Sequence, residues 1–102
     1  MKVSTQNLTN KDDVRLIRDF ISQNRGGKEV IARILEAYGF TTRITLCKQL
    51  GVSQSTMANR YARDTFPADW VIVCHLETGA SLIWLSTGVG SKFVDGRDDQ
   101  SV

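Results

Sequence analysis

Six side chains between residues 54 and 63 can form hydrogen bonds to DNA, and none of the six is acidic. They are Gln54, Ser55, Thr56, Asn59, Arg60 and Arg63. Amide and guanidinium groups pair with base edges in the major groove, whereas arginine and hydroxyl groups also bind phosphates. In a helix, most of these side chains lie opposite Met57 and Tyr61, which are four residues apart. The pattern favours contact with a nucleic acid, and the plain alternative is a polar helix face that meets only water.

Three residues that precede this stretch complete the candidate surface. Thr42 and Arg43 begin an expected helix, where a hydroxyl and a guanidinium group are placed for phosphate contact. Ser53 stands just before the second helix and can cap it by accepting a hydrogen bond from a free backbone N–H group. Within that helix, Gln54 can pair with adenine or contact a phosphate, and Asn59 lies further along the exposed face.

These nine residues belong to two short helices that a tight turn must join. Gly51 ends the first helix, because glycine readily takes the left-handed conformation found there. This arrangement is the helix-turn-helix motif, whose second helix, here 54–63, lies in the major groove. Many such motifs have an apolar residue three positions after Met57, where this chain has Arg60. We expect Tyr61 to take that place, with Arg60 turned outward.

Apolar spacing predicts further helices on both sides of the motif. The full set of expected helices is 11–24, 28–38, 43–50, 54–63, 67–78 and 82–87. Pro67 is expected at the first position of its helix, with Val73 and Leu76 on the apolar side of that helix. Ile44 is expected on the apolar side of the first motif helix. No alternating run is long enough to indicate a strand.

The helix expected at 11–24 is amphipathic. Its apolar residues fall within about half of the helical circumference, and they are Val14, Leu16, Ile17, Phe20 and Ile21. An apolar patch of this size is unusual on a monomer. Our hypothesis is that it packs against a second subunit, and the alternative is that it folds back onto its own domain and enlarges the core.

The composition narrows the class of protein. With 41% hydrophobic and 24% charged residues, the 102 residues suit one soluble domain. Residues 40–66 hold four basic side chains and one acidic one, whereas residues 67–102 hold two basic and five acidic ones. The positive excess therefore lies on the motif, where a phosphate backbone attracts it. No apolar run approaches ~20 residues and no signal peptide is visible, so we expect no membrane contact and no export.

No arrangement of residues typical of an enzyme or of a metal site is visible. The chain shows no carboxylates paired in a pocket, no nucleophile beside a base and no glycine-rich phosphate loop. Cys47 and Cys74 each lie in an apolar helical pattern, so reduced, buried thiols are expected. His75 has no set of partners at the spacing of metal ligands. We expect no catalytic residue, no metal and no cofactor.

Four segments resemble a known family of DNA-binding domains. The segments are IARILEAYGF at 31–40, SQSTMANRYAR at 53–63, FPADW at 66–70 and CHLETGASLIWLSTGVG at 74–90. They resemble the N-terminal DNA-binding domain of bacteriophage CI-type repressors, which belongs to the lambda-repressor-like class of five-helix domains. The resemblance implies an all-α fold with a helix-turn-helix over about residues 28–94. Residues 1–27 then form an extension with an additional N-terminal helix, and residues 95–102 a linker or tail.

The resemblance also implies a function. It implies a sequence-specific transcriptional repressor that binds double-stranded operator DNA as a dimer, with helix 54–63 in the major groove. The expected partners are operator DNA and further copies of the chain, as a homodimer or higher homo-oligomer. The expected location is the cytoplasm of a bacterial host, at the nucleoid. The alternative is a protein-interaction module that keeps this fold, such as an antitoxin or an antirepressor-type regulator.

Overall fold

The computed structural model describes residues 10–93, so residues 1–9 and the expected tail at 95–102 lie outside the described part. Six α-helices make up that part: α1 Lys11–Gln23, α2 Gly27–Tyr38, α3 Arg43–Leu50, α4 Gln54–Arg63, α5 Ala68–Thr78 and α6 Leu82–Thr87. Their bounds agree with the expected ones to within one residue at each end. Within residues 10–93, the only β contact is an isolated bridge between Ala80 and Phe93. The all-α prediction is confirmed.

The helix starts and ends follow local chemistry. Thr42, Ser53 and Ser81 stand at the N-caps of α3, α4 and α6, where each side chain accepts a hydrogen bond from a backbone N–H three residues later. Pro67 was expected inside α5, but it occupies the N-cap, and the helix begins one residue later. Gly51 ends α3 in the left-handed conformation, with φ 72°, as expected.

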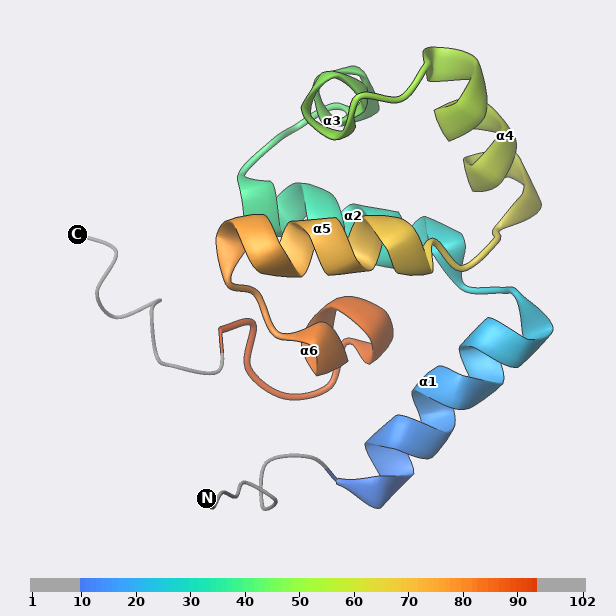
Figure 1. Ribbon diagram of the computed structural model, residues 1–102, viewed down its shortest axis with the longest axis vertical. Helices are drawn as coiled ribbons and strands as arrows, with labels where there is room; N and C mark the ends of the chain where they lie inside the picture. The colour runs from blue at the N-terminus through green and yellow to red at the C-terminus, as the bar shows by residue number, and fades with distance from the viewer. Residues whose placement is uncertain (1–9, 94–102) are drawn as a thin grey trace.

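Helices α2 and α5 form the centre of the fold. In Figure 1 they lie together across the middle, with α3 and α4 above them and α6 below. The apolar side chains that α2 buries are Val30, Ile31 and Ile34, and those that α5 buries are Trp70, Val71 and Cys74. The side chains of both helices meet in one core, and α4 packs against α2. The position of the α3–α4 motif is therefore fixed relative to this core.

Three apolar residues expected in the core are exposed instead. Ile44 is 52% exposed, Val73 37% and Leu76 74%. Helix geometry explains Ile44 and Leu76, because a residue two positions away lies about 200° around the helix. Ile44 therefore points away from the buried Leu46, and Leu76 points away from the buried Cys74. An apolar helix such as α5 does not reveal from composition alone which side is covered.

Helix α1 folds back onto its own domain and packs against α6. Phe20 is half-buried against the core, with its ring centroid 6.3 Å from that of Phe66. None of the residues of α1 is fully buried, and Val14 and Ile21 stay 36% and 51% exposed. Of the two alternatives for this helix, the structure shows packing within the chain, and that packing covers only part of the apolar side.

The end of α4 is fastened to the start of α2. The backbone carbonyl of Asp64 accepts a hydrogen bond from Gly27 N at 3.0 Å, and its carboxylate accepts one from Lys28 N at 2.8 Å. A Cβ atom on Gly27 would lie 1.9 Å from the carbonyl oxygen of Thr65, so this contact requires glycine. The carboxylate at a helix N-terminus also stabilises α2 through the helix dipole.

Candidate nucleic-acid interface

Helix α4 lies at the outer end of the molecule, beyond α2 and α5 (Figure 1). Met57 is buried with 2% exposure, and Tyr61 is half-buried against the core, as expected for the inner side. The exposed residues of α4 are Gln54, Ser55, Ala58, Asn59, Ala62 and Arg63. None of these carries a negative charge, so this face can approach phosphates without repulsion.

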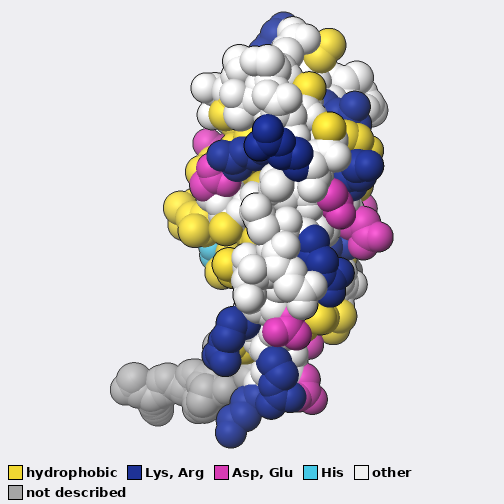
Figure 2. All heavy atoms as spheres, turned by 90° about the vertical axis from the view of Figure 1, so that its right-hand side faces the viewer, with side chains coloured by type: hydrophobic (Ala, Val, Ile, Leu, Met, Phe, Trp, Pro, Cys, Tyr) yellow, Lys and Arg dark blue, Asp and Glu magenta, His cyan; other side chains and the backbone are white. Residues whose placement is uncertain are grey.

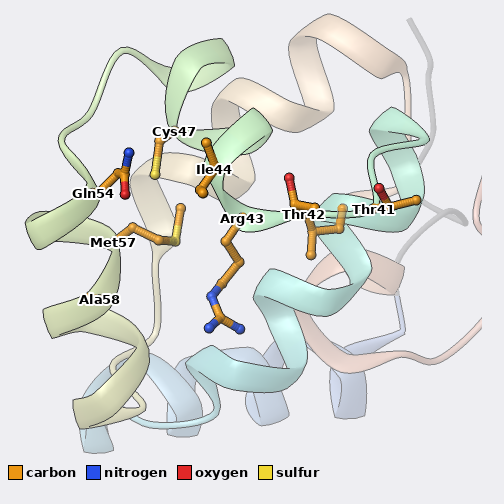
Figure 3. Close-up of a pocket in the computed structure, with 9 residues that line it drawn as sticks. Thr41, Thr42, Arg43, Ile44, Cys47, Gln54, Met57 and Ala58 are labelled. Atoms are coloured by element: carbon orange, nitrogen blue, oxygen red, sulfur yellow. The ribbon is translucent and has the colours of Figure 1, made fainter.

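A surface hollow of about 460 Å³ lies on one side of α4, between that helix and the start of α3. Figure 3 shows the side chains around it, with Gln54 and Met57 coming from α4, and Thr42 and Arg43 from the start of α3. The hollow also includes Ala58, whose small side chain leaves it open. The two motif helices therefore form a concave surface between them.

Two positive charges stand beside this first hollow. The guanidinium carbon of Arg43 lies 3.8 Å from the centroid of the Tyr61 ring, and Lys28 Nζ lies 5.5 Å from the same centroid. Cation–π attraction of this kind orients the side chains without neutralising them. Within residues 10–93, neither Arg43 nor Lys28 forms an ion pair with a carboxylate. Their charges remain available to an anion.

A second hollow, of about 480 Å³, lies on the other side of α4. Asn59 and Arg63 line it from α4, Asp69 from α5, and Asn24 from the turn after α1. Helix α4 is therefore a ridge with a hollow along each flank. The ridge brings together residues that the sequence places on one short helix, and the hollows add residues from other parts of the chain.

Arg60 does not turn outward as expected. Its Nη1 donates a 2.7 Å hydrogen bond to Asp69 Oδ1, and its guanidinium carbon lies 4.4 Å from the centroid of the Trp70 ring. Burial by itself raises the pKa of Asp69, but the hydrogen bond and charge of Arg60 outweigh this and hold that pKa below its usual value. Much of the positive charge of Arg60 is thus already paired, and the side chain joins α4 to α5.

The other predicted residues divide into two groups. The hydroxyls of Thr42 and Ser53 serve as helix caps, and Thr56 is half-buried, accepting a hydrogen bond from Ser53 Oγ at 2.9 Å. Exposed positions on α4 hold Gln54, Ser55, Asn59 and Arg63. Within residues 10–93, the side chains of Gln54, Asn59 and Arg63 form no hydrogen bond or ion pair, which leaves them free to contact a ligand.

Several residues at or beside this surface were not predicted from the sequence. Ala58 follows Gln54 by four residues, and Thr45 follows the N-cap Thr42 by three, with the two threonine oxygens 2.9 Å apart. Helical spacing alone could have identified both of these. Asn24 and Lys28 reach the surface from the other side of the chain, and no local signal places them there.

Among residues 10–93, no group of three or more histidine, cysteine, aspartate or glutamate side chains is placed to hold a metal ion. Cys47 and Cys74 are free and buried, and burial raises the pKa of the Cys74 thiol to about 11. None of the described helices has the length and apolar character needed to cross a membrane.

Comparison with known proteins identifies a family for most of the chain. Residues 29–93 match the protein family described as the bacteriophage CI repressor helix-turn-helix domain. The chain is 65% identical to protein ORFi in retron Ec67 of Escherichia coli over 72 residues. These residues cover 71% of this chain and 36% of that protein. It is 44% identical over 70 residues to repressor protein CI of Escherichia phage 186, which covers 69% of this chain and 36% of that protein.

A third relative is also similar to this chain over about a third of its own length. Repressor protein CI of Haemophilus phage HP1, strain HP1c1, is 46% identical over 74 residues, which cover 72% of this chain and 38% of that protein. The chain thus matches little more than a third of the length of each of these relatives. The family match includes α3 and α4 and extends to all of the packed core behind them. The chain belongs to the family of bacteriophage CI repressor helix-turn-helix domains.

Proposed function

We propose that this chain is the DNA-binding part of a transcriptional repressor and binds double-stranded operator DNA with α4 in the major groove. The observation that carries the proposal is the ridge of α4, exposed, free of acidic side chains on its outer face and flanked by two hollows. The major groove is about 12 Å wide and admits an α-helix. The phosphate strands then run along both sides of that helix, where the two hollows lie.

The exposure of each side chain suggests its role. Gln54, Ser55 and Asn59 are exposed on the ridge and read base edges. Arg43 and Arg63 contact phosphates, because each is exposed at the border of a hollow and neither is ion-paired within residues 10–93. The remaining residues of the predicted surface hold the motif in shape and contact phosphates secondarily: Thr42, Ser53, Thr56 and Arg60.

The dimer and the domain division belong to the same proposal. Two relatives are named repressor protein CI, and the match to each covers about a third of that protein. We take residues 28–94 as the DNA-binding domain and residues 1–27 as an extension. The protein binds operator DNA as a homodimer or higher homo-oligomer, because a two-fold symmetric operator presents two half-sites about 34 Å apart, one for each copy. This binding takes place in the bacterial cytoplasm.

A second candidate is a protein-interaction module, such as an antitoxin or antirepressor-type regulator. The exposed apolar side of α5, where Ile72 is 53% and Leu76 is 74% exposed, favours it. Scattered exposed apolar residues are common on protein surfaces, however. The unpaired base-reading residues of α4 favour DNA, and binding to duplex DNA that weakens steeply with salt separates the two candidates.

The deciding experiment is binding of the chain to DNA that flanks its own gene, followed by footprinting. We expect a protected, two-fold symmetric site. Asn59→Ala should reduce discrimination at one base pair by ~1–3 kcal/mol. The matched control is Gln49→Ala, which removes an exposed α3 amide that donates to Glu77 Oε1 at 3.0 Å, away from the α4 ridge. Full discrimination by Asn59→Ala at every operator position would mean that this residue does not read bases.

A further inference from the structure

The wall of the second hollow contains a residue from outside the matched family region. The family match begins at residue 29, and α1 with the turn that follows it lies before that position. Asn24, in this turn, nevertheless lines the hollow together with Asn59 and Arg63 of α4. An addition to the family domain is thus part of the surface beside the ridge of α4.

The turn after α1 is held rigidly in this place. Asn24 ends α1 in the left-handed conformation, with φ 52°, and its Oδ1 accepts a hydrogen bond from Phe66 N at 3.2 Å. The backbone N–H of Arg25 donates to the carbonyl of Phe20 at 3.2 Å. One end of the turn is therefore bonded to the connection between α4 and α5, which fixes its position relative to α4.

This turn also carries a positive charge, that of Arg25, which follows Asn24 directly in the chain. The guanidinium carbon of Arg25 lies 4.9 Å from the centroid of the Phe20 ring, and Phe20 in turn packs against Phe66, which lines the hollow. Arg25 is exposed and donates to the neutral side chain of Gln23, with no carboxylate partner within residues 10–93. Its charge is therefore not compensated.

The face that carries α4 and α1 is rich in positive charge. Figure 2 shows lysine and arginine side chains distributed along its whole length, with fewer acidic side chains between them. In the second hollow, the acidic Asp69 is already paired with Arg60. Arg63 is exposed and, like Arg25, has no carboxylate partner in the described part of the chain. The hollow therefore offers the amide groups of Asn24 and Asn59 and the unpaired guanidinium group of Arg63, and Arg25 adds a second unpaired guanidinium group in the adjoining turn. Such a set of donors suits an anion with a spread-out charge.

We propose that the turn at Asn24 and Arg25, acting with Arg63, binds backbone phosphates of duplex DNA along the flank of α4 opposite Arg43. This inference rests on the proposed function, because it requires α4 to occupy the major groove. One phosphate strand then meets the start of α3 at the first hollow, and the other strand meets the α1 turn at the second. Helix α1 extends the DNA-binding surface by holding this turn in position.

The test compares variants at two arginine positions of the full chain across a salt series, on operator and on random DNA. Arg25→Ala should weaken binding to both DNAs equally, on the order of tenfold at about 0.1 M salt, and lower the salt slope by ~1. Arg15→Ala is the matched control, since Arg15 is also exposed on the α1 side but pairs with Asp12 at 3.4 Å. It should leave the slope unchanged. Arg25→Lys should restore most of the slope, because it keeps the charge.

Ethylation interference then locates the contact. A phosphate whose ethylation blocks the parent but not Arg25→Ala, on the strand opposite the Arg43 contacts, supports the proposal. An unchanged slope for Arg25→Ala, or an equal loss for Arg15→Ala, overturns it. If Asn59→Ala still loses discrimination in that case, the proposed function stands and only this inference fails. If the parent chain binds no duplex DNA at all, both fail together.

Discussion

The two hollows beside α4 have similar sizes but are built in different ways. The first is lined mainly by residues 41–58, which are neighbours in sequence and belong to one motif, with Leu35 added. The second is lined by residues from 24 to 69, which come from the α1 turn, α4 and the start of α5. The surface beside a helix-turn-helix can therefore be formed on one flank by residues of the motif itself, and on the other flank by residues that tertiary packing brings in. Substitutions that loosen tertiary contacts should therefore affect the second flank more.

The largest expected effect is on stability, at the point where α2 meets the α4–α5 connection. Gly27→Ala would place a Cβ atom 1.9 Å from the Thr65 carbonyl oxygen. Overpacking of this kind costs about 3 kcal/mol, and chemical denaturation measures it. The control is Gly39→Ala, where φ is +79° and no atom lies within 4 Å of the added Cβ. It should cost only about 1–2 kcal/mol of backbone strain. Equal losses for both variants would show that the α2 contact is not tight.

A smaller effect is expected at the carboxylate that caps α2 from the end of α4. Asp64 has φ 58°, and its Oδ1 accepts from Lys28 N at 2.8 Å. Asp64→Ala loses the cap and strains the left-handed backbone, which together cost about 2 kcal/mol. Asp64→Asn keeps the acceptor and tolerates that backbone, so its loss should stay below about 1 kcal/mol. Thermal unfolding of both variants checks the order, and a larger loss for the asparagine variant would contradict it.

The two flanks can also be compared through DNA affinity. Arg43→Ala should weaken binding to all sequences and lower the salt slope by ~1, as proposed for Arg25→Ala on the other flank. The double variant should lose the sum of the two effects, because sites without shared partners behave additively. The measurement is the DNA affinity of the parent, both single variants and the double variant across a salt series. A double variant no weaker than either single one would mean that the two arginines serve one contact.

The smallest expected effect concerns pH and the pair that joins α4 to α5. The pKa of Asp69 is held below its usual value in the folded chain, mainly by Arg60. Its contribution to stability is therefore present above a pH of about 4 and is lost as the pH falls through the lowered pKa. Asp69 is 58% exposed, so solvent screening keeps the contribution below about 1 kcal/mol.

Denaturation between pH about 2 and 6 measures this contribution. Asp69→Asn should be less stable than the parent at the upper end of the range, and the difference should shrink toward the lower end. Asp19→Asn serves as the control, because Asp19 forms no ion pair within residues 10–93. A constant difference across the range would show that the Arg60–Asp69 pair does not contribute through the charge of the carboxylate.

Most of the fold and one flank of the site could be predicted from the sequence. The cap at Ser53 and the glycine at 51 placed the start of α4 and the end of α3 to the residue, because these signals act over three or four positions. The prediction of which side chains are buried failed for helices that carry apolar residues on more than one face. Leu76 and Ile44 lie on helices with apolar residues on more than one face, and only packing decides which face is covered.

Arg60 shows the same limit within the site. Its spacing placed it near the edge of the reading face, but its charge is paired with Asp69, nine residues later in the chain. Asn24 reached the interface without any local signal, since 35 positions separate it from Asn59 along the sequence. Neither position follows from helical periodicity, because each depends on how a separate helix packs against α4.

The sequence by itself determined which segments are helical, where each helix begins and ends to within one residue, and that Met57 and Tyr61 form the inner side of α4. Those properties depend on hydrogen bonds and side-chain spacing within one or two turns of helix. The tertiary structure alone decided that Arg60 is paired, that α1 folds back onto α6, and that Asn24 closes a hollow beside α4. These properties depend on contacts between helices distant in sequence, where covered area and charge pairing outweigh local preference.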